Sequence, residues 1–442
     1  MKVGIVGGGI LGLTLGYRLA GRGHAVEIFE AAPALGGLAC THDYGPFFWD
    51  RFYHCILPTD SNLIGLLREL GLSGDLRFTK TGTGYWARGR AYDMNGNLDY
   101  LRFPLLSLTD KMRLGAAVLY ASHLADPWKL YQVSAQDWLT RVCGRRGYEI
   151  FWRPLLKAKF GPFYDRVAAV FIWATLTRLL GARAGGTKQE TMGYVSGGYR
   201  RILGRFAEEL ARLGAIVRTG TNVVGVRKAG SGCELGFRED GSEGRAQLDQ
   251  VFFTAPSRLA RAIVDAELGP HVVKAERDYP TSGAYLGVAC LVLVLRRPLT
   301  RYYVLNIGDE SIELTGVIEM TNLIDRRTET GGLSLVYLPR YLDSSDPRLD
   351  ASDQELAGTM MERGLLRLFG DLRADDFVYR RIHRTRYVQP LPLVRTGDAQ
   401  PAQFPTLERP FQILNTSMLT CATLNNNEVV GLVDKFVAQS AL

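Results

Sequence analysis

Apolar and polar positions along the first 30 residues predict a strand, a helix and a second strand. Lys2–Val6 and Ala25–Phe29 are short apolar runs typical of buried strands. Between them, leucines recur at four-residue steps over Ile10–Arg22, which predicts a helix that Gly23 ends. In such a βαβ unit the two strands run parallel.

The pattern then predicts a loop, a helical block and a second α/β section. Gly36–His54 reads as a loop, and 105–185 reads as a helical block interrupted near Gly161. The expected helices are Ser61–Leu70, Leu106–Ser122, Ser134–Arg141, Arg146–Leu180 and Tyr199–Leu213. The expected strands are Ala215–Arg218, Val223–Arg227, Cys233–Arg238 and Leu248–Thr254.

From residue 283 onward the pattern is mostly that of strands separated by turn signals, as in an antiparallel sheet. The expected strands here are Tyr285–Leu295, Tyr302–Ile307, Leu314–Met320, Leu333–Leu338, Val378–Val388 and Phe411–Asn415. Two helices are expected among them, Ser352–Phe369 and Glu428–Gln439.

Composition narrows the class of protein. A chain of 442 residues predicts two or three cores, and 46% apolar with 22% charged residues excludes a mainly disordered protein. The net charge of +8 suits an anionic partner such as a phosphorylated substrate, and is too mild to indicate nucleic acid. Six cysteines without Cys-x-x-Cys spacing predict reduced thiols and no metal site. No apolar run reaches the length of a membrane span, so we expect a cytoplasmic protein.

The first turn carries a nucleotide-binding pattern. Gly7-Gly8-Gly9-Ile10-Leu11-Gly12 fits G-x-G-x-x-G directly after a strand, and Glu30 closes the second strand. Gly9 lets the backbone approach a pyrophosphate, which then lies on the N-terminus of the helix. Glu30 is placed to accept hydrogen bonds from a ribose, and its charge argues against a 2′-phosphate.

A second glycine pair extends the pattern into a resemblance. Glu30-x5-Gly36-Gly37 resembles the flavin enzyme family of amine oxidases, protoporphyrinogen oxidase and phytoene desaturases, with UDP-galactopyranose mutase as a more distant relative. Many members carry Arg where Ala34 stands here. The resemblance implies FAD and an α/β fold, in which a Rossmann-type FAD-binding domain holds an inserted substrate domain of mixed β-sheet plus helices. The implied ranges are 1–75, 190–265 and 405–442 for FAD, 76–189 for a helical part and 266–404 for a sheet part.

The same resemblance implies the residues that contact the cofactor. The Val223 backbone would face the adenine, Asn415 would take the place of the acid that holds the ribityl chain, and the helix that opens at Asn427 would face the flavin pyrimidine. The full expected set is Gly7, Gly9, Ile10, Leu11, Gly12, Glu30, Ala31, Gly36, Gly37, Leu38, Val223, Asn415, Asn427 and Glu428.

Catalytic and substrate residues are harder to assign, since a flavin needs few side chains for its chemistry. His54 follows the cofactor loop and could bind substrate or cap a loop, and a Glu inside an apolar strand needs a partner. The catalytic candidates are His54, Glu319 and Tyr337. The substrate candidates are Tyr303, Asn306, Arg340, Arg384, Arg386 and Tyr387. The arginines on the strand Val378–Val388 could hold a phosphate, or could be a solvated edge.

Three functions remain open at this point. The first is an FAD-dependent oxidoreductase that moves a hydride from a C–H bond of a small molecule to flavin N5. The alternative is a redox-neutral mutase of the UDP-galactopyranose mutase type acting on a nucleotide-sugar, and the third is a non-enzymatic flavoprotein. A peripheral membrane contact and ordinary core packing explain the tryptophans of the helical block equally well, namely Trp128, Trp138, Trp152 and Trp173. The sequence leaves the oligomeric state open.

Overall fold

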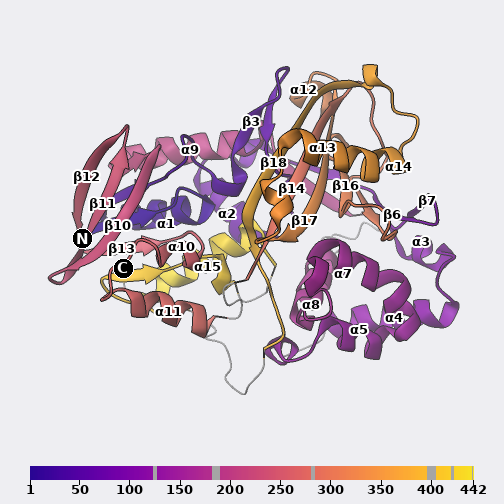
Figure 1. The fold of residues 1–442 in the computed structure, drawn as a ribbon, viewed down its shortest axis with the longest axis horizontal. Helices are drawn as coiled ribbons and strands as arrows, with labels where there is room; N and C mark the ends of the chain where they lie inside the picture. The colour runs from indigo at the N-terminus through magenta and orange to yellow at the C-terminus, as the bar shows by residue number, and fades with distance from the viewer. Residues whose placement is uncertain (123–126, 182–189, 280–283, 396–404, 420–422, 441) are drawn as a thin grey trace.

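The structure is a computed structural model that describes residues 1–122, 127–181, 190–279, 284–395, 405–419, 423–440 and 442. Figure 1 shows three parts. A parallel sheet with helices α1, α9 and α15 lies at one end, a large mixed sheet extends from the centre to the other end, and a helical block with α4, α5, α7 and α8 lies below the sheet at that end. The expected α/β fold class is therefore confirmed.

The first part is built on a five-stranded sheet in which all paired strands are parallel. Its strands, in spatial order, are β19 (Phe411–Ile413), β13 (Gln250–Phe253), β1 (Lys2–Val6), β2 (Ala25–Phe29) and β9 (Ile216–Arg218). The helices packed around it are α1 (Ile10–Gly21), α2 (Ser61–Glu69), α9 (Gly198–Arg212) and α15 (Asn426–Gln439). Three distant stretches of the chain thus share one sheet.

An antiparallel sheet of three strands lies beside this part. It contains β10 (Thr221–Ala229), β11 (Gly232–Glu239) and β12 (Ser242–Leu248), and two short helices follow, α10 (Ser257–Ala260) and α11 (Gly269–Asp278). The apolar pattern misses β12 because most of its side chains are polar and exposed, so the strand has no buried face to reveal it.

The large sheet has seven strands and is antiparallel except where β15 pairs with β6. In spatial order it contains β18 (Phe377–Pro390), β14 (Tyr285–Leu295), β17 (Ser334–Asp343), β16 (Gly316–Glu319), β15 (Val304–Ile307), β6 (Thr83–Ala87) and β7 (Arg90–Asp93). A separate pair joins β5 (Leu76–Lys80) to β8 (Thr191–Val195). Residues 76–93, which the sequence analysis placed in the helical part, are therefore strands.

Strand β14 is buried along its whole length and separates two cores. Its inner face, defined by Val288, Cys290, Val292 and Val294, packs on Tyr44, Trp49 and Leu57. Its outer face, defined by Ala289, Leu291 and Leu293, packs on helix α13 (Asp353–Met360). Because side chains alternate along each strand, neighbouring residues of β14 between Val288 and Val294 belong to different cores.

The helical block packs on the far part of the large sheet. It contains α3 (Asn97–Arg102), α4 (Leu108–Ser122), α5 (Ala135–Cys143), α6 (Arg145–Gly147), α7 (Arg153–Phe160) and α8 (Ala169–Gly181), with a π-helical turn over Tyr148–Trp152. Trp138 and Trp152 are buried in it, and Trp173 Nε1 donates to the carbonyl of Ala121 at 2.8 Å. These tryptophans therefore serve packing. None of the helices in the described ranges combines the length and apolarity needed to cross a membrane.

The remaining elements are short. The expected loop 36–54 contains a hairpin of β3 (Thr41–Asp43) and β4 (Phe48–Asp50). Helices α12 (Arg326–Glu329) and α14 (Leu366–Leu368) connect the strands of the large sheet.

Candidate functional site

The glycines of the first turn have two different tasks. A Cβ at Gly12 would lie 2.0 Å from the carbonyl oxygen of Gly7, so Gly12 allows α1 to pack against the turn. A Cβ at Gly9 would meet nothing closer than Gly37 Cα at 4.0 Å. The space beside the Gly9 Cα is therefore open. Only a bound group would require this space to remain free of side-chain atoms.

The N-terminus of α1 points at this open space without a cap. Gly9 is the N-cap residue, no side chain accepts a hydrogen bond there, and the first turn has no acidic residue. Free backbone N–H groups and the positive end of the helix dipole favour an anion at such a position. The second glycine pair lies on the same turn, because Gly36 N donates to Gly8 O at 2.8 Å and both Gly36 and Gly37 have positive φ.

Glu30 lies at the rim of the turn. Its Oε2 accepts from Gly8 N at 2.6 Å and its Oε1 accepts from Ala32 N at 2.8 Å. Because a carboxylate offers about four acceptor positions, two remain for the hydroxyl groups of a ribose. Thr221 N donates to the Glu30 carbonyl at 2.9 Å, which places the start of β10, and with it Val223, on the same side of the sheet edge.

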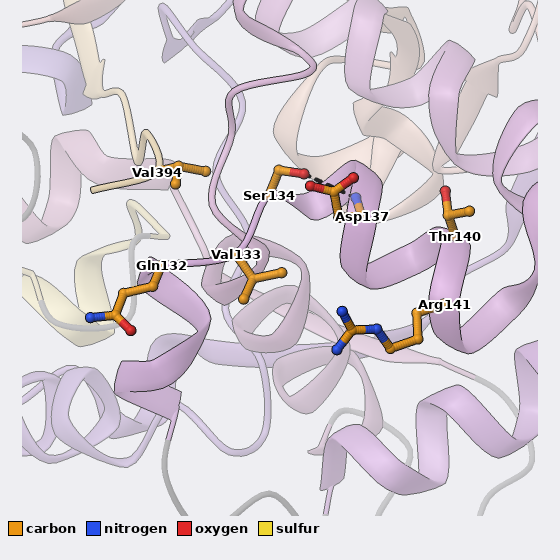
Figure 2. A pocket seen from close by; sticks show the side chains of 7 residues that line it. All are labelled: Gln132, Val133, Ser134, Asp137, Thr140, Arg141 and Val394. Atoms are coloured by element: carbon orange, nitrogen blue, oxygen red, sulfur yellow. Dashed lines mark hydrogen bonds between the residues drawn. The ribbon is translucent and has the colours of Figure 1, made fainter. Parts of the chain in front are cut away.

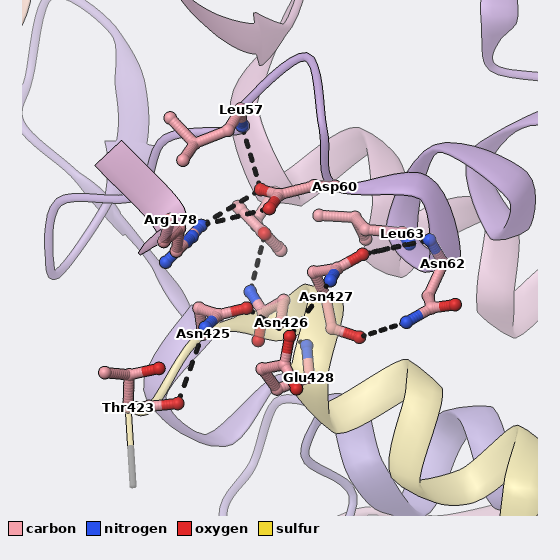
Figure 3. Close-up of polar contacts among 11 residues, drawn as sticks. Leu57, Asp60, Asn62, Leu63, Arg178, Thr423, Asn425, Asn426, Asn427 and Glu428 are labelled. Carbon is pink, nitrogen blue, oxygen red and sulfur yellow. Dashed lines mark hydrogen bonds and ion pairs between the residues drawn. The ribbon is translucent and has the colours of Figure 1, made fainter. Parts of the chain in front are cut away.

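Two helix N-termini meet at a second point, which Figure 3 shows. Asn427 Oδ1 accepts from Asn62 N at 2.9 Å and from Leu63 N at 3.2 Å, so its side chain caps α2. Asn425 caps α15 by accepting from Glu428 N at 3.0 Å. The side chain of Asn427 is thus committed to α2, and only the backbone of this turn is left to face a ligand.

Asn415 is also committed within the chain. It is buried, its Nδ2 donates to the Ala255 carbonyl and to Ser257 Oγ, and its Oδ1 accepts from Ser417. The side chain ties the end of β19 to the residues after β13, and a ribityl contact of this side chain would have to replace one of those bonds.

A buried carboxyl group organises the loop over the inner face. Asp50 Oδ1 accepts from Tyr199 N at the start of α9 at 2.9 Å, and the Asp50 carbonyl accepts from Tyr337 Oη at 2.5 Å. Tyr44 Oη donates to the same carbonyl at 3.1 Å. His54 Nδ1 lies 3.6 Å from Asp50 Oδ2, which is too long for a hydrogen bond.

Burial sets the protonation of this region. It raises the pKa of Asp50, and it holds the pKa values of Tyr303 and Tyr337 well above 10, so both tyrosines remain O–H donors. Burial also raises the pKa of the Cys55 thiol and lowers the pKa of His383 to about 3, so that this imidazole is neutral.

Three polar atoms beside the inner face are buried and have no hydrogen-bond partner in the part of the chain that the structure describes: Trp49 Nε1, His54 Nδ1 and Tyr303 Oη. The His54 ring lies 4.6 Å from the ring of Tyr199, whose hydroxyl accepts from Asn426 at the start of α15. Buried donors are normally satisfied, so these atoms indicate a place for a bound molecule. Together with the open turn at Gly9, they fit a dinucleotide with a large ring system.

Alternation places several of the sequence candidates on the other side of the sheet. Glu319 pairs in register with Val336, a residue of the outer core, and its carboxyl accepts from Leu299 N, Thr321 Oγ1 and Ser334 Oγ. It therefore supports the sheet. Arg340 also faces the outer core and pairs with Glu313 at 2.6 Å.

The arginines of β18 have partners from another segment. Arg384 pairs with Asp353 at 2.9 Å, and Arg386 pairs with Asp350. Two of the arginines that could have held a phosphate are therefore paired with acids that lie more than 30 positions earlier in the chain. Of the other candidates, Asn306 is half-buried and donates weakly to Gly84 O at 3.4 Å, and Tyr387 packs on Tyr285.

One contact that the sequence did not suggest links the helical block to the site. Arg178, near the end of α8, donates from Nη2 to both carboxyl oxygens of Asp60 at 3.0 and 3.3 Å (Figure 3). Asp60 is buried and also accepts from Leu57 N at 2.8 Å. No local pattern announces a pair whose members are 118 residues apart.

A surface hollow of about 560 Å³ lies elsewhere, at the N-terminus of α5 (Figure 2). Its lining residues are Gln132, Val133, Ser134, Asp137, Thr140, Arg141 and Val394. The hydroxyl of Ser134 already accepts from Asp137 N as the helix cap. The hollow shares no residue with the turn or the inner face, so we do not assign it to the site.

Comparisons with known proteins agree on one family. The family model described as flavin containing amine oxidoreductase matches residues 12–412. A Mycobacterium tuberculosis H37Rv protein, provisionally named flavin-containing monoamine oxidase AofH, is 26% identical over 299 residues, which cover 63% of this chain and 62% of that protein. The alignment thus spans less than two thirds of the curated relative.

Solved structures share the fold. Putrescine oxidase bound to putrescine has a TM-score of 0.71 at 18% identity, covering 99% of this chain and 98% of that chain. A provisionally named protoporphyrinogen oxidase from Exiguobacterium sp. 255-15 has a TM-score of 0.69 at 14% identity, with 99% and 98% covered. Reduced UDP-galactopyranose mutase has a TM-score of 0.64 at 15% identity, with 89% and 84% covered.

Proposed function

Since the chain belongs to the flavin containing amine oxidoreductase family, whose cofactor is FAD, we propose that it oxidises a C–H bond of a small-molecule substrate. The observation that carries this proposal is the set of buried, unpartnered polar atoms beside the inner face, Trp49 Nε1, His54 Nδ1 and Tyr303 Oη. Trp49 and Tyr303 belong to the inner core, and His54 packs on Tyr199 at the start of α9, which Asn426 of α15 also contacts.

The residues that would hold FAD follow from the two ends of the site. The turn at Gly9 and the uncapped N-terminus of α1 would take the pyrophosphate, and Glu30 would take the ribose. The second loop at Gly36 and the backbone of the first turn of α15 would face the rest of the cofactor. When bound, FAD supplies the two-electron acceptor of the reaction.

The side chains of the inner face would bind and orient the substrate and exclude water. Tyr303 and Tyr337 are neutral O–H donors because burial raises their pKa values, so they can hold a polar group of the substrate in place. Asp50 fixes the loop that carries His54 by accepting from Tyr199 N and, through its carbonyl, from Tyr337.

An anionic or phosphorylated substrate has only modest support, which comes from the net charge of +8. Arg384 and Arg386 lie away from the inner face and are paired with Asp353 and Asp350. The alternative hypothesis, a redox-neutral sugar mutase, depended in part on the same arginines. No feature of the inner face, as far as the structure describes it, favours a mutase over an oxidase. A reducing, cytoplasmic location is supported by the described cysteines, all of which are free.

The test is anaerobic bleaching of the protein-bound flavin by candidate small molecules, beginning with primary and secondary amines. Tyr303→Phe should slow bleaching, while Tyr302→Phe should not, because Tyr302 packs in the outer core. Equal rates in both variants would remove the inner face as the substrate site. Turnover of a nucleotide-sugar only after chemical reduction of the flavin would establish the mutase instead.

A further inference from the structure

Helices α3 and α4 carry an unusual outer surface. Six large apolar side chains there are between 53% and 68% exposed: Leu98, Leu101, Leu108, Met112, Leu119 and Tyr120. Single exposed apolar residues are ordinary on proteins, but a group of them within 23 positions of the sequence needs a reason. We call these six side chains the apolar patch.

The spacing on α4 forms one continuous stripe. Leu108, Met112 and Leu119 are separated by four and seven positions, which places them on one side of the helix with the small exposed residues Gly115 and Ala116 between them. The opposite side of α4 is buried and also apolar, with Leu114, Ala117 and Ala121 in the core of the block. A helix that only met water would be polar on its outer side.

Helix α3 continues the patch. Lys111 Nζ donates to the carbonyl of Leu101 at 2.6 Å, so the end of α3 lies against the first turns of α4. Both helices are at the end of the molecule opposite the parallel sheet (Figure 1). The patch is therefore separate from the cofactor turn and from the inner face.

Two exposed arginines flank the patch, Arg102 on α3 and Arg113 on α4. On the neighbouring α6, Arg145 lies 4.0 Å from Glu149 and Arg146 lies 3.6 Å from Asp110, so these two arginines are paired with acids. Asp99 accepts from Asn95 N and Gly96 N, and Asp110 also accepts from Ser107 N. An apolar stripe flanked by arginines is typical of helices that lie in the interface of an anionic bilayer.

We propose that α3 and α4 form a docking surface for an anionic lipid bilayer, with the apolar patch entering the headgroup region and the flanking arginines meeting lipid phosphates. A second copy of the chain fits this surface less well, because self-association would bring the same arginines together. At 1.5 Å per residue, α4 is about 22 Å long, so it would lie along the bilayer without crossing it. The proposal is independent of the redox reaction.

The experiment is co-sedimentation of the full-length flavoprotein with vesicles of phosphatidylcholine alone and of phosphatidylcholine mixed with phosphatidylglycerol. Wild type should bind the mixed vesicles, and added salt should weaken binding. The double variant Met112→Asp, Leu119→Asp should bind the mixed vesicles at least about tenfold more weakly than wild type does. Arg102→Glu with Arg113→Glu should lose the preference for phosphatidylglycerol while the apolar patch remains. The matched control is Val273→Asp, an apolar residue on α11 that is 53% exposed and lies outside the patch.

Retained flavin absorbance and an unchanged thermal midpoint would show that each variant is folded. Equal binding of wild type and the Met112, Leu119 double variant would overturn the proposal, as would failure of wild type to bind either vesicle. A wild-type dimer in analytical ultracentrifugation that this variant dissociates, without lipid binding, would assign the patch to self-association instead.

Discussion

An alanine at position 9 should separate cofactor binding from folding. The Gly9 backbone has φ −74° and ψ 175°, an extended conformation that alanine adopts freely, and the new Cβ would have no protein atom within contact distance except Gly37 Cα at 4.0 Å. Gly12→Ala is the matched control, because its Cβ would lie 2.0 Å from Gly7 O and would force α1 away from the turn.

Gly9→Ala should weaken FAD binding, whereas Gly12→Ala should destabilise the apoprotein. In the apoprotein, Gly9→Ala loses about 0.5–1 kcal/mol at the N-cap and regains about 0.4–1 kcal/mol from the unfolded chain, so its stability should stay nearly unchanged. Overpacking by Gly12→Ala should cost about 1–3 kcal/mol of unfolding free energy. The affinity of Gly9→Ala for FAD should fall by about 1.5–3 kcal/mol, since the methyl group displaces the pyrophosphate from a charge-assisted hydrogen bond. That loss corresponds to a rise in Kd of roughly ten- to a hundredfold.

Titration of each apoprotein with FAD, followed by quenching of flavin fluorescence, gives the Kd, and thermal unfolding without FAD gives the stability. A wild-type Kd in Gly9→Ala would refute the assignment of this turn to the pyrophosphate. A loss of apoprotein stability in Gly9→Ala as large as that in Gly12→Ala would show that Gly9 is needed for folding alone.

Three further predictions concern the carboxyl groups and tyrosines of the site. Glu30→Ala should raise the Kd for FAD by roughly ten- to a hundredfold, measured by the same titration, whereas an unchanged Kd would exclude a ribose contact. Because burial raises the pKa of Asp50, wild type should be most stable relative to Asp50→Asn below about pH 4 and should lose that advantage as the pH rises through the folded-state pKa. Urea unfolding of both proteins at several pH values measures this difference in stability, and a parallel pH dependence of the two proteins would contradict the prediction. Tyr303→Phe should leave the stability of the apoprotein unchanged or raise it, since its hydroxyl has no hydrogen-bond partner among the described residues, while Tyr337→Phe should cost about 1 kcal/mol by removing the bond to the Asp50 carbonyl. Equal costs in calorimetry would show that Tyr303 Oη is satisfied.

The parts of the fold that the sequence predicts well are those with a single buried pattern. Strands β1, β2 and β14 have the predicted bounds, because each is a mainly apolar run that is mostly buried. Strands β5, β7 and β12 were missed because their side chains are largely polar and partly or fully exposed, and they exist through pairing with neighbours that only the fold supplies.

The residues of the candidate site also fall into those that the sequence predicts and those that it does not. The glycines at positions 7, 9 and 12 and the acid at position 30 act through local backbone geometry, so their spacing predicts them. Alternation predicts which residues of a strand share a face, but not which layer covers that face, so the sequence could not show that Glu319 and Arg384 lie away from the inner face. The pair of Arg178 with Asp60 depends on two helices from different parts of the chain, which no local pattern reveals.

The order of strands in the parallel sheet has a consequence for synthesis on the ribosome. Strand β1 is among the first residues made, yet its neighbour β13 follows only after the helical block, and the edge strand β19, which pairs with β13, follows only after the rest of the large sheet. At 5–20 residues per second, the roughly 240 residues between β1 and β13 take about 12–50 s to translate, and the roughly 400 residues between β1 and β19 take about 20–80 s. The apolar edge of β1 lacks its final partner for the first of these periods and the sheet is incomplete for the second, so the nascent chain should depend on a chaperone, and the cofactor should enter only after translation is nearly complete.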